Sequence, residues 1–272
     1  MRTTTEEYRK GLGKKESYLI SSLARENKKI FTAEDVKTLI GDGAKNVIYN
    51  LIRKKWILKL KRGLYAIVPL DIGVKGAESF AVHSFVIGSK LADPYYIGYW
   101  SALNHYGFSD QIPATTFIAT TKPKKGIGIM HDSYLFVQLS EKKFFGTTET
   151  EIEGEKVRIS DENKTIADCL DHPEYCGGID EIARSIFFSR DEIDFARVKA
   201  YALKMGNMAI LKRLGCILDS AGLLEEYKDV FEGVRLSKGY ALLDPISQKQ
   251  GSYNDKWGLL VNYELKPDGW LY

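Results

Sequence analysis

The side chains with the most definite chemistry lie in the segment AKNVIYNLIRK, residues 44–54. Six of them recur at helical spacing in two neighbouring rows, namely Lys45, Tyr49 and Arg53, and Asn46, Asn50 and Lys54. On a helix, both rows share one face. Arginine can donate two hydrogen bonds to guanine, asparagine can pair with adenine, and lysine binds phosphate. The spacing therefore predicts a helix that reads the major groove of double-stranded DNA.

Three more basic side chains surround a predicted hairpin turn just beyond this helix, namely Lys59, Lys61 and Arg62. Trp56, Leu58 and Leu60 alternate with Ile57, Lys59 and Lys61, and Leu64 to Ile67 follow as a second short strand. Gly63 suits the turn between them. A basic hairpin tip can clamp the DNA backbone or enter the minor groove, so these residues are predicted to form a DNA-binding wing.

Two earlier helices are expected to hold the reading helix in place. Glu16 to Asn27 has amphipathic spacing, and Thr32 with Asp35 resembles a capping box before a second apolar stripe. The triplet at residues 41–43, Gly-Asp-Gly, predicts a sharp turn into the reading helix. These elements predict a winged helix-turn-helix over residues 16–70, the head, preceded by a mobile basic N-terminal arm at residues 1–15.

Positive charge collects in the same part of the chain. Residues 1–70 hold 16 Lys and Arg against 7 Asp and Glu, a net charge of 16 − 7 = +9. The remainder holds 39 − 16 = 23 against 36 − 7 = 29, a net charge of −6. Winged helices also serve as protein-interaction modules, and a basic helix face can be an ordinary solvated surface. Charge asymmetry together with the basic wing favours DNA binding.

One winged helix reads a short site. Useful specificity usually requires two copies on an inverted repeat. We therefore expect two protomers on the operator.

Residues 77–272, the body, are predicted to be a mixed α+β domain with a small antiparallel sheet and a helical C-terminal half. Helices are expected at residues 77–91, 97–106 and 161–170, with four more helical stretches between 179 and 232. Strands are expected at residues 116–121, 133–139, 149–153, 155–160, 240–243 and 258–263. The fold class is therefore α+β, with a winged helix-turn-helix in front.

The body shows no convincing catalytic or metal-binding motif. Cys169, His172 and Cys176 have zinc-like spacing but lack a fourth ligand nearby, so buried structural cysteines are the better interpretation. Asp132 and Glu141-x-Lys143 are the residue types of a nuclease magnesium site. They bracket one predicted strand, however, which would separate them by about 30 Å. We expect no enzyme activity, no cofactor and no metal.

No stretch has the roughly 18 apolar residues that a membrane span needs, and the N-terminus lacks the apolar region of a secretory signal. Three scattered cysteines fit a reducing compartment. A cytoplasmic location without membrane contact is expected.

Four segments together resemble the AbiEi-type antitoxins. They are RGLYAI at residues 62–67, YYIGYWSALNHYGFS at 95–109, TFIATTKPKK at 116–125, and SDENKTIADCLDHPEYCGGIDEIA at 160–183. The resemblance implies a transcriptional regulator with an N-terminal winged helix and a C-terminal antitoxin domain. It also implies a type IV toxin–antitoxin pair, in some cases active in phage abortive infection, whose toxin is nucleotidyltransferase-like and is opposed without a stable complex.

The same resemblance implies repression of the protein's own operon, and it supplies no catalytic residues. Residues 101–107 and 161–170 are interpreted as structural, with an antitoxin surface as the alternative. Two rival functions stay open. One is a ligand-sensing repressor, which would need a pocket with convergent polar groups. The other is a nuclease that the winged helix targets to DNA.

Overall fold

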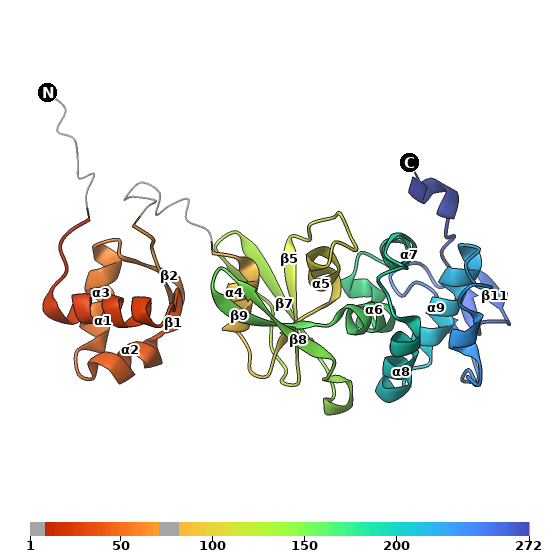
Figure 1. Cartoon of the computed structure of the whole chain (residues 1–272), viewed down its shortest axis with the longest axis horizontal. Coiled ribbons are helices and arrows are strands. Elements are labelled where there is room, and N and C mark those ends of the chain that lie inside the picture. Colours follow the sequence, from red (N-terminus) through yellow and green to blue (C-terminus); the bar gives the residue numbers. More distant parts are fainter. Residues whose placement is uncertain (1–8, 71–81, 272) are drawn as a thin grey trace, which may run out of the picture. The chain divides into compact units, whose positions relative to one another are not determined.

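The computed structural model describes residues 9–70 and 82–271 (Figure 1). The chain divides into two compact units. The first extends to Leu91 and takes in residues 128–132 and 151–157, and the second contains the rest of the body. Residues 71–81 lie outside the described part, so the predicted domain limits at residues 70 and 77 stay predictions. The predicted α+β class is confirmed.

The head contains three helices and a three-stranded antiparallel sheet. The helices are α1 (Lys14–Arg25), α2 (Ala33–Ile40) and α3 (Ala44–Arg53). The strands are β1 (Ile30–Thr32), β2 (Ile57–Lys61) and β3 (Leu64–Ile67), in the order β1-β3-β2. The strand β1 was not predicted, because three residues are too few to show an alternating pattern. It joins the wing through β3, where Phe31 lies opposite Tyr65 and their rings stack 5.7 Å apart.

Local sequence explains how α2 and α3 begin. The Thr32 hydroxyl accepts from the Asp35 N–H at 3.2 Å, and the Asp35 carboxylate accepts from the Thr32 N–H at 2.6 Å. This arrangement is the predicted capping box. Gly43 has a φ of +92°, in the left-handed region that glycine adopts without strain, and α3 begins at the next residue. The helix-turn-helix geometry is therefore encoded locally.

One apolar core holds the head together. It takes side chains from all three helices and from the sheet, namely Leu19, Leu23, Phe31, Val36, Val47, Ile48, Leu51, Ile57 and Tyr65. Because α3 contributes Val47, Ile48 and Leu51 to this core, its opposite side is left facing outward.

The body is built on a six-stranded sheet with the order β6-β7-β5-β4-β9-β8. Its strands are β4 (Tyr96–Ile97), β5 (Thr115–Thr120), β6 (Ile127–Ile129), β7 (Asp132–Gln138), β8 (Thr147–Ile152) and β9 (Glu155–Ser160). The pair β4–β5 is antiparallel, whereas β5–β7 and β4–β9 are parallel. A second sheet has the order β10-β12-β11, from β10 (Ala241–Leu242), β11 (Ser252–Asn254) and β12 (Leu259–Val261).

The α-helices of the body are α4 (Ser84–Ser89), α5 (Tyr99–His105), α6 (Glu162–Asp171), α7 (Ile179–Phe188), α8 (Phe195–Met205) and α9 (Ala209–Ser220). Within residues 82–271, four short 3-10 helices accompany them, η2 (Glu141–Lys143), η3 (Pro173–Tyr175), η4 (Lys228–Phe231) and η5 (Pro267–Leu271). A continuous core joins the sheet to α5 through α9, with Tyr96, Phe117 and Val137 on the sheet side. The helical C-terminal half is thus confirmed.

A buried charged network fastens α6 to β4. The Lys164 ammonium contacts the Asp168 carboxylate and lies 3.2 Å from the Tyr96 hydroxyl, which donates to Asp168 at 2.8 Å. Burial raises the pKa of Asp168, although Lys164 and Tyr96 act in the opposite direction. Because residues 163–171 are all buried, this stretch is structural, and the alternative of an antitoxin surface has little support there.

Several element boundaries differ from the predictions. Ile97 forms a strand with Tyr96 instead of opening the helix expected at residues 97–106, because Ile97 pairs with both Ile118 and Ile159. Residues 127–129, for which no strand was expected, form the strand β6. Of the helix expected at residues 77–91, the described part contains α4 alone.

Candidate nucleic-acid interface

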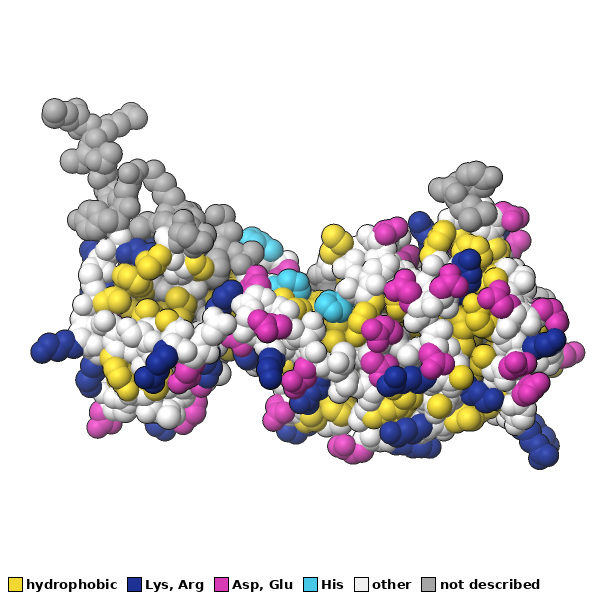
Figure 2. Space-filling model, viewed as in Figure 1, with side chains coloured by type: hydrophobic (Ala, Val, Ile, Leu, Met, Phe, Trp, Pro, Cys, Tyr) yellow, Lys and Arg dark blue, Asp and Glu magenta, His cyan; other side chains and the backbone are white. Residues whose placement is uncertain are grey.

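The outward side of α3 carries the predicted base-reading residues. Lys45, Asn46, Tyr49 and Arg53 are all exposed, and the Tyr49 side chain has 63% of its surface accessible. The helix begins after a glycine turn, and its opposite side packs against the core of the head. The exposed row is therefore held in a fixed position. On the face of the protein drawn in Figure 2, Lys and Arg side chains stand out on the head, and Asp and Glu side chains are frequent on the body.

Two members of this row contact each other. The Arg53 guanidinium lies over the Tyr49 ring, 5.9 Å from its centroid. Such a cation–π contact restricts the arginine while leaving its N–H groups free to donate. Arg53 is therefore partly pre-oriented for a guanine or a phosphate.

The wing places three basic side chains at and beside a tight turn. Lys59 and Arg62 are exposed, and Lys61 is half-buried. Gly63 has a φ of +80°, and its carbonyl accepts from the Ala33 N–H at 2.9 Å, at the start of α2. A register shift between Lys59 and Lys61 adds a bulge, which increases the local twist of the strand. The turn is thereby tied to the helix-turn-helix.

Asn50 and Lys54 differ from the other predicted contacts because both engage Glu16 of α1. The Lys54 ammonium lies 2.5 Å from the Glu16 carboxylate, and Asn50 helps to lower the pKa of the same carboxyl group. Burial raises the pKa of Glu16, but hydrogen bonds from Lys54, the Gly13 N–H and Asn50 outweigh burial and lower it. The predicted DNA contacts thus comprise an exposed group, the half-buried Lys61, and the pair Asn50 and Lys54, which both act on Glu16.

Glu16 was not among the residues selected from the sequence. It is the first residue of the segment predicted to be an amphipathic helix, yet it is buried and is the third residue of α1. The available signal was its position, since a glutamate there can bond back to the N–H of the residue that precedes the helix.

The catalytic candidates of the body are not assembled into a site. Asp132 is the first residue of β7, whereas Glu141 and Lys143 lie in η2, beyond the far end of that strand. Lys143 pairs with Asp171 at 2.6 Å. Cys169 and Cys176 are buried in the apolar core, as predicted. Among residues 9–70 and 82–271, no group of three or more His, Cys, Asp and Glu side chains is arranged to hold a metal ion.

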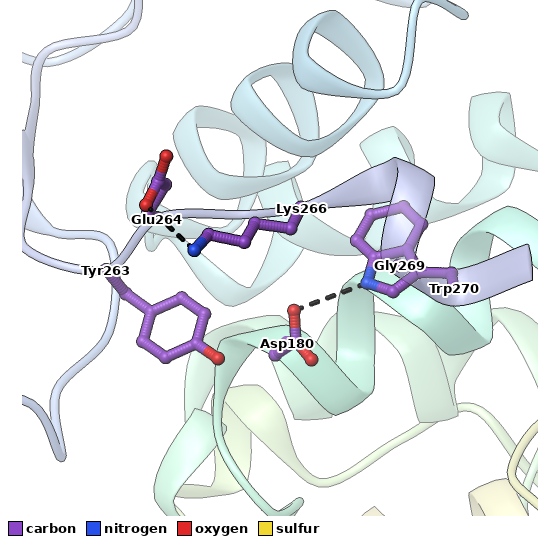
Figure 3. A pocket seen from close by; sticks show the side chains of 6 residues that line it. All are labelled: Asp180, Tyr263, Glu264, Lys266, Gly269 and Trp270. Atoms are coloured by element: carbon purple, nitrogen blue, oxygen red, sulfur yellow. Dashed lines mark hydrogen bonds and ion pairs between the residues drawn. The ribbon is translucent and has the colours of Figure 1, made fainter. Parts of the chain in front are cut away.

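A cavity of about 390 Å³ in the body bears on the ligand-sensing alternative (Figure 3). Its lining residues are Asp180, Tyr263, Glu264, Lys266, Gly269 and Trp270. Lys266 pairs with Glu264 at 3.3 Å, and the Trp270 indole donates to Asp180 at 3.3 Å. Since these polar groups interact with one another, the cavity offers little specific support for a small-molecule sensor.

A helix-turn-helix followed by a short wing, with an exposed polar row on its second helix, defines the head as a winged-helix DNA-binding domain. Residues 18–68 match the model of a family described as transcriptional regulator, AbiEi antitoxin. This segment is therefore similar to the AbiEi antitoxin family of transcriptional regulators, and the resemblance is confirmed over the head. The match supports a DNA-binding, antitoxin-type regulatory role.

Among solved structures, the chain is similar to the RV2827C protein from Mycobacterium tuberculosis. The two share 13% sequence identity, with a TM-score of 0.63 over 94% of each chain. At that identity the similarity shows a common fold, which extends through the body. No curated protein matches the chain. Within the described ranges, no helix is both long and apolar enough to cross a membrane.

Proposed function

We propose that the protein represses its own operon and is the antitoxin of a type IV toxin–antitoxin pair. The head binds an inverted-repeat operator as two protomers. The body counteracts a nucleotidyltransferase-like toxin without a stable complex, and the protein acts in the cytoplasm. The observation that carries the DNA-binding half is the exposed row of Lys45, Asn46, Tyr49 and Arg53 on a helix that the core holds from behind. The family match over residues 18–68 supports the regulatory and antitoxin roles.

In this proposal the body acts without catalysis. Support comes from the separation of Asp132 from Glu141 and Lys143 by the length of β7. The engagement of Lys143 with Asp171 points the same way. Magnesium-dependent DNA cleavage that disappears in Asp132→Ala would instead establish the nuclease alternative.

The wing provides the first test of the DNA-binding half. A duplex enriched from a random pool by the full-length protein is compared with a scrambled duplex of equal length, at several salt concentrations. Lys61→Ala should weaken binding to both duplexes alike and reduce the steepness of log K against log [salt] by about one. If the parent shows neither sequence preference nor salt-dependent binding, the proposed function is wrong.

A further inference from the structure

An ion pair with little access to water joins the recognition helix to the first helix of the head. The Glu16 and Lys54 side chains are 7% and 17% exposed. Lys54 also donates to the Gly11 carbonyl at 2.9 Å, and Glu16 accepts from the Gly13 N–H at 2.7 Å. The Lys54 ammonium therefore has two acceptors within the protein.

The residues before α1 are attached at further points, and we call residues 9–13 the N-terminal strap. Arg9 donates to the carbonyls of Val68 at 2.9 Å and Pro69 at 2.5 Å, and its guanidinium lies 5.3 Å from the centroid of the Trp56 ring. The Trp56 indole in turn donates to the Lys10 carbonyl at 2.9 Å. The basic arm expected to be mobile over residues 1–15 is thus bound to the head from Arg9 onward. Residues 1–8 lie outside the described part.

The charges of the pair suit the helices that carry them. Glu16 is in the first turn of α1, where the helix dipole favours a negative charge, and Lys54 ends α3, where it favours a positive one. If Lys54 moved to a DNA phosphate, Glu16 would keep its charge in a site with little water and without its main partner. Breaking such a pair is strongly unfavourable. The pair should therefore persist when DNA binds.

We propose that Glu16 and Lys54 form a clasp that positions the recognition helix for base reading, with Lys54 staying on Glu16 in the DNA complex. Asn50 lies one turn before Lys54 on the same helix, and its carbonyl accepts from the Lys54 N–H at 2.9 Å, so the clasp also holds the C-terminal part of the reading face in place. The inference rests on the proposed DNA binding. It makes Glu16 a positioning residue and assigns Lys54 to the same role instead of to phosphate contact.

The test compares two lysines of the full-length protein, Lys54 in the clasp and Lys61 in the wing. Affinities of Lys54→Met and Lys61→Met are measured for the enriched and scrambled duplexes over a range of KCl concentrations. Circular dichroism establishes that each variant is folded at the temperature used. Lys61→Met should reduce the salt slope by about one for both duplexes. Lys54→Met should keep the parent's slope and lose roughly tenfold in preference for the enriched duplex, as when one base contact is misplaced.

Two further variants separate positioning from folding. Glu16→Gln should lose the same preference as Lys54→Met, and the double variant should be no worse than either single one, because both break one clasp. Lys54→Arg keeps the charge and should retain both preference and slope, which leaves a folded variant to measure if Lys54→Met unfolds.

A slope reduced by about one in Lys54→Met would show a phosphate contact and overturn the proposal. If Lys54→Met keeps both the salt slope and the sequence preference of the parent, the clasp serves folding alone, and the proposal is also overturned. A parent that fails to bind either duplex removes the proposed function itself, an outcome distinct from both.

Discussion

Arg53 and Tyr49 are both exposed, yet each restricts the other. Because the Arg53 guanidinium already lies over the Tyr49 ring, the side chain has lost part of its rotamer freedom. Binding to DNA therefore costs it less conformational entropy than it would cost an unrestrained arginine. A phosphate contact would need only the charge, which lysine also supplies. The pair therefore predicts a base-specific role for Arg53.

Arg53→Ala should weaken binding to the enriched duplex by about 1–3 kcal/mol, with a penalty that depends on one base pair. Competition against duplexes carrying single-base changes measures that dependence. Arg53→Lys is the matched control, since it should retain the salt slope and lose the base preference. Equal weakening for every sequence would instead indicate a backbone contact.

Two carboxylates make the head sensitive to acid. Burial raises the pKa of Glu16 and of Asp35, but Lys54 and Lys28 respectively, with neighbouring hydrogen bonds, bring each below its ordinary value of 4.5 or 3.8. A depressed folded pKa contributes stability that is fully present above the unfolded pKa. That contribution is lost as the pH falls through the folded pKa. The head should therefore lose stability below about pH 4.5.

Thermal unfolding followed by circular dichroism from neutrality to about pH 3 checks this expectation. Glu16→Gln should be less stable than the parent near neutrality and should lose less stability on acidification. Glu26→Gln changes an exposed glutamate at the end of the same helix and should keep the parent's pH dependence. An identical acid response in Glu16→Gln would contradict the assignment.

At the scale of elements, the turn at residues 41–43 determines how α2 presents α3. Gly43 has a left-handed conformation with a φ of +92°, and the recognition helix starts immediately after it. An L-amino acid with a Cβ would be strained there, whereas the capping box at Thr32 would still start α2 normally. The angle between the two helices therefore depends on this glycine.

Gly43→Ala should destabilise the protein by about 1–2 kcal/mol, because its Cβ crowds the backbone in that conformation. Chemical unfolding at equilibrium gives the difference. Gly11→Ala is the control, because a Cβ at Gly11 meets no atom within 4 Å and its φ is not positive. It should change stability by less than about 0.5 kcal/mol. Equal effects at the two positions would show that the turn carries no conformational strain.

At the scale of the whole molecule, the head and the body differ in net charge, and we expect them to differ in function. The basic head carries the exposed groove-reading side chains, and the acidic body has its own core and its own buried charged network. If the body opposes the toxin, loss of DNA binding should leave that activity intact.

Full-length Arg53→Ala/Arg62→Ala should fail to repress a reporter placed behind its own promoter and should still restore growth when the toxin is co-expressed. The opposite variant is Lys164→Met, which leaves Asp168 buried without its partner and should destabilise the body by about 3–5 kcal/mol. It should lose growth rescue. Rescue that disappears with the first variant would show that antitoxic action depends on DNA binding.

Local rules were enough for the head and for part of the body. The capping box at Thr32, the glycine turn and the spacing from Lys45 to Arg53 each depend on neighbours within a few residues, so the sequence by itself determined the helix-turn-helix and its outward face. The same holds for α6, where Asp161 accepts from the Lys164 N–H as the cap.

Tertiary structure decided those features that depend on residues far apart in the sequence. Ile97 became a strand residue because Ile118 and Ile159 lie beside it, and helical periodicity could not reveal those partners. Lys54 has the spacing of a groove-facing lysine, but Glu16, 38 residues earlier, brings its ammonium back into the protein. Spacing along a helix specifies which residues share a face. Which of them are free to bind a ligand depends on what the rest of the chain places against that face.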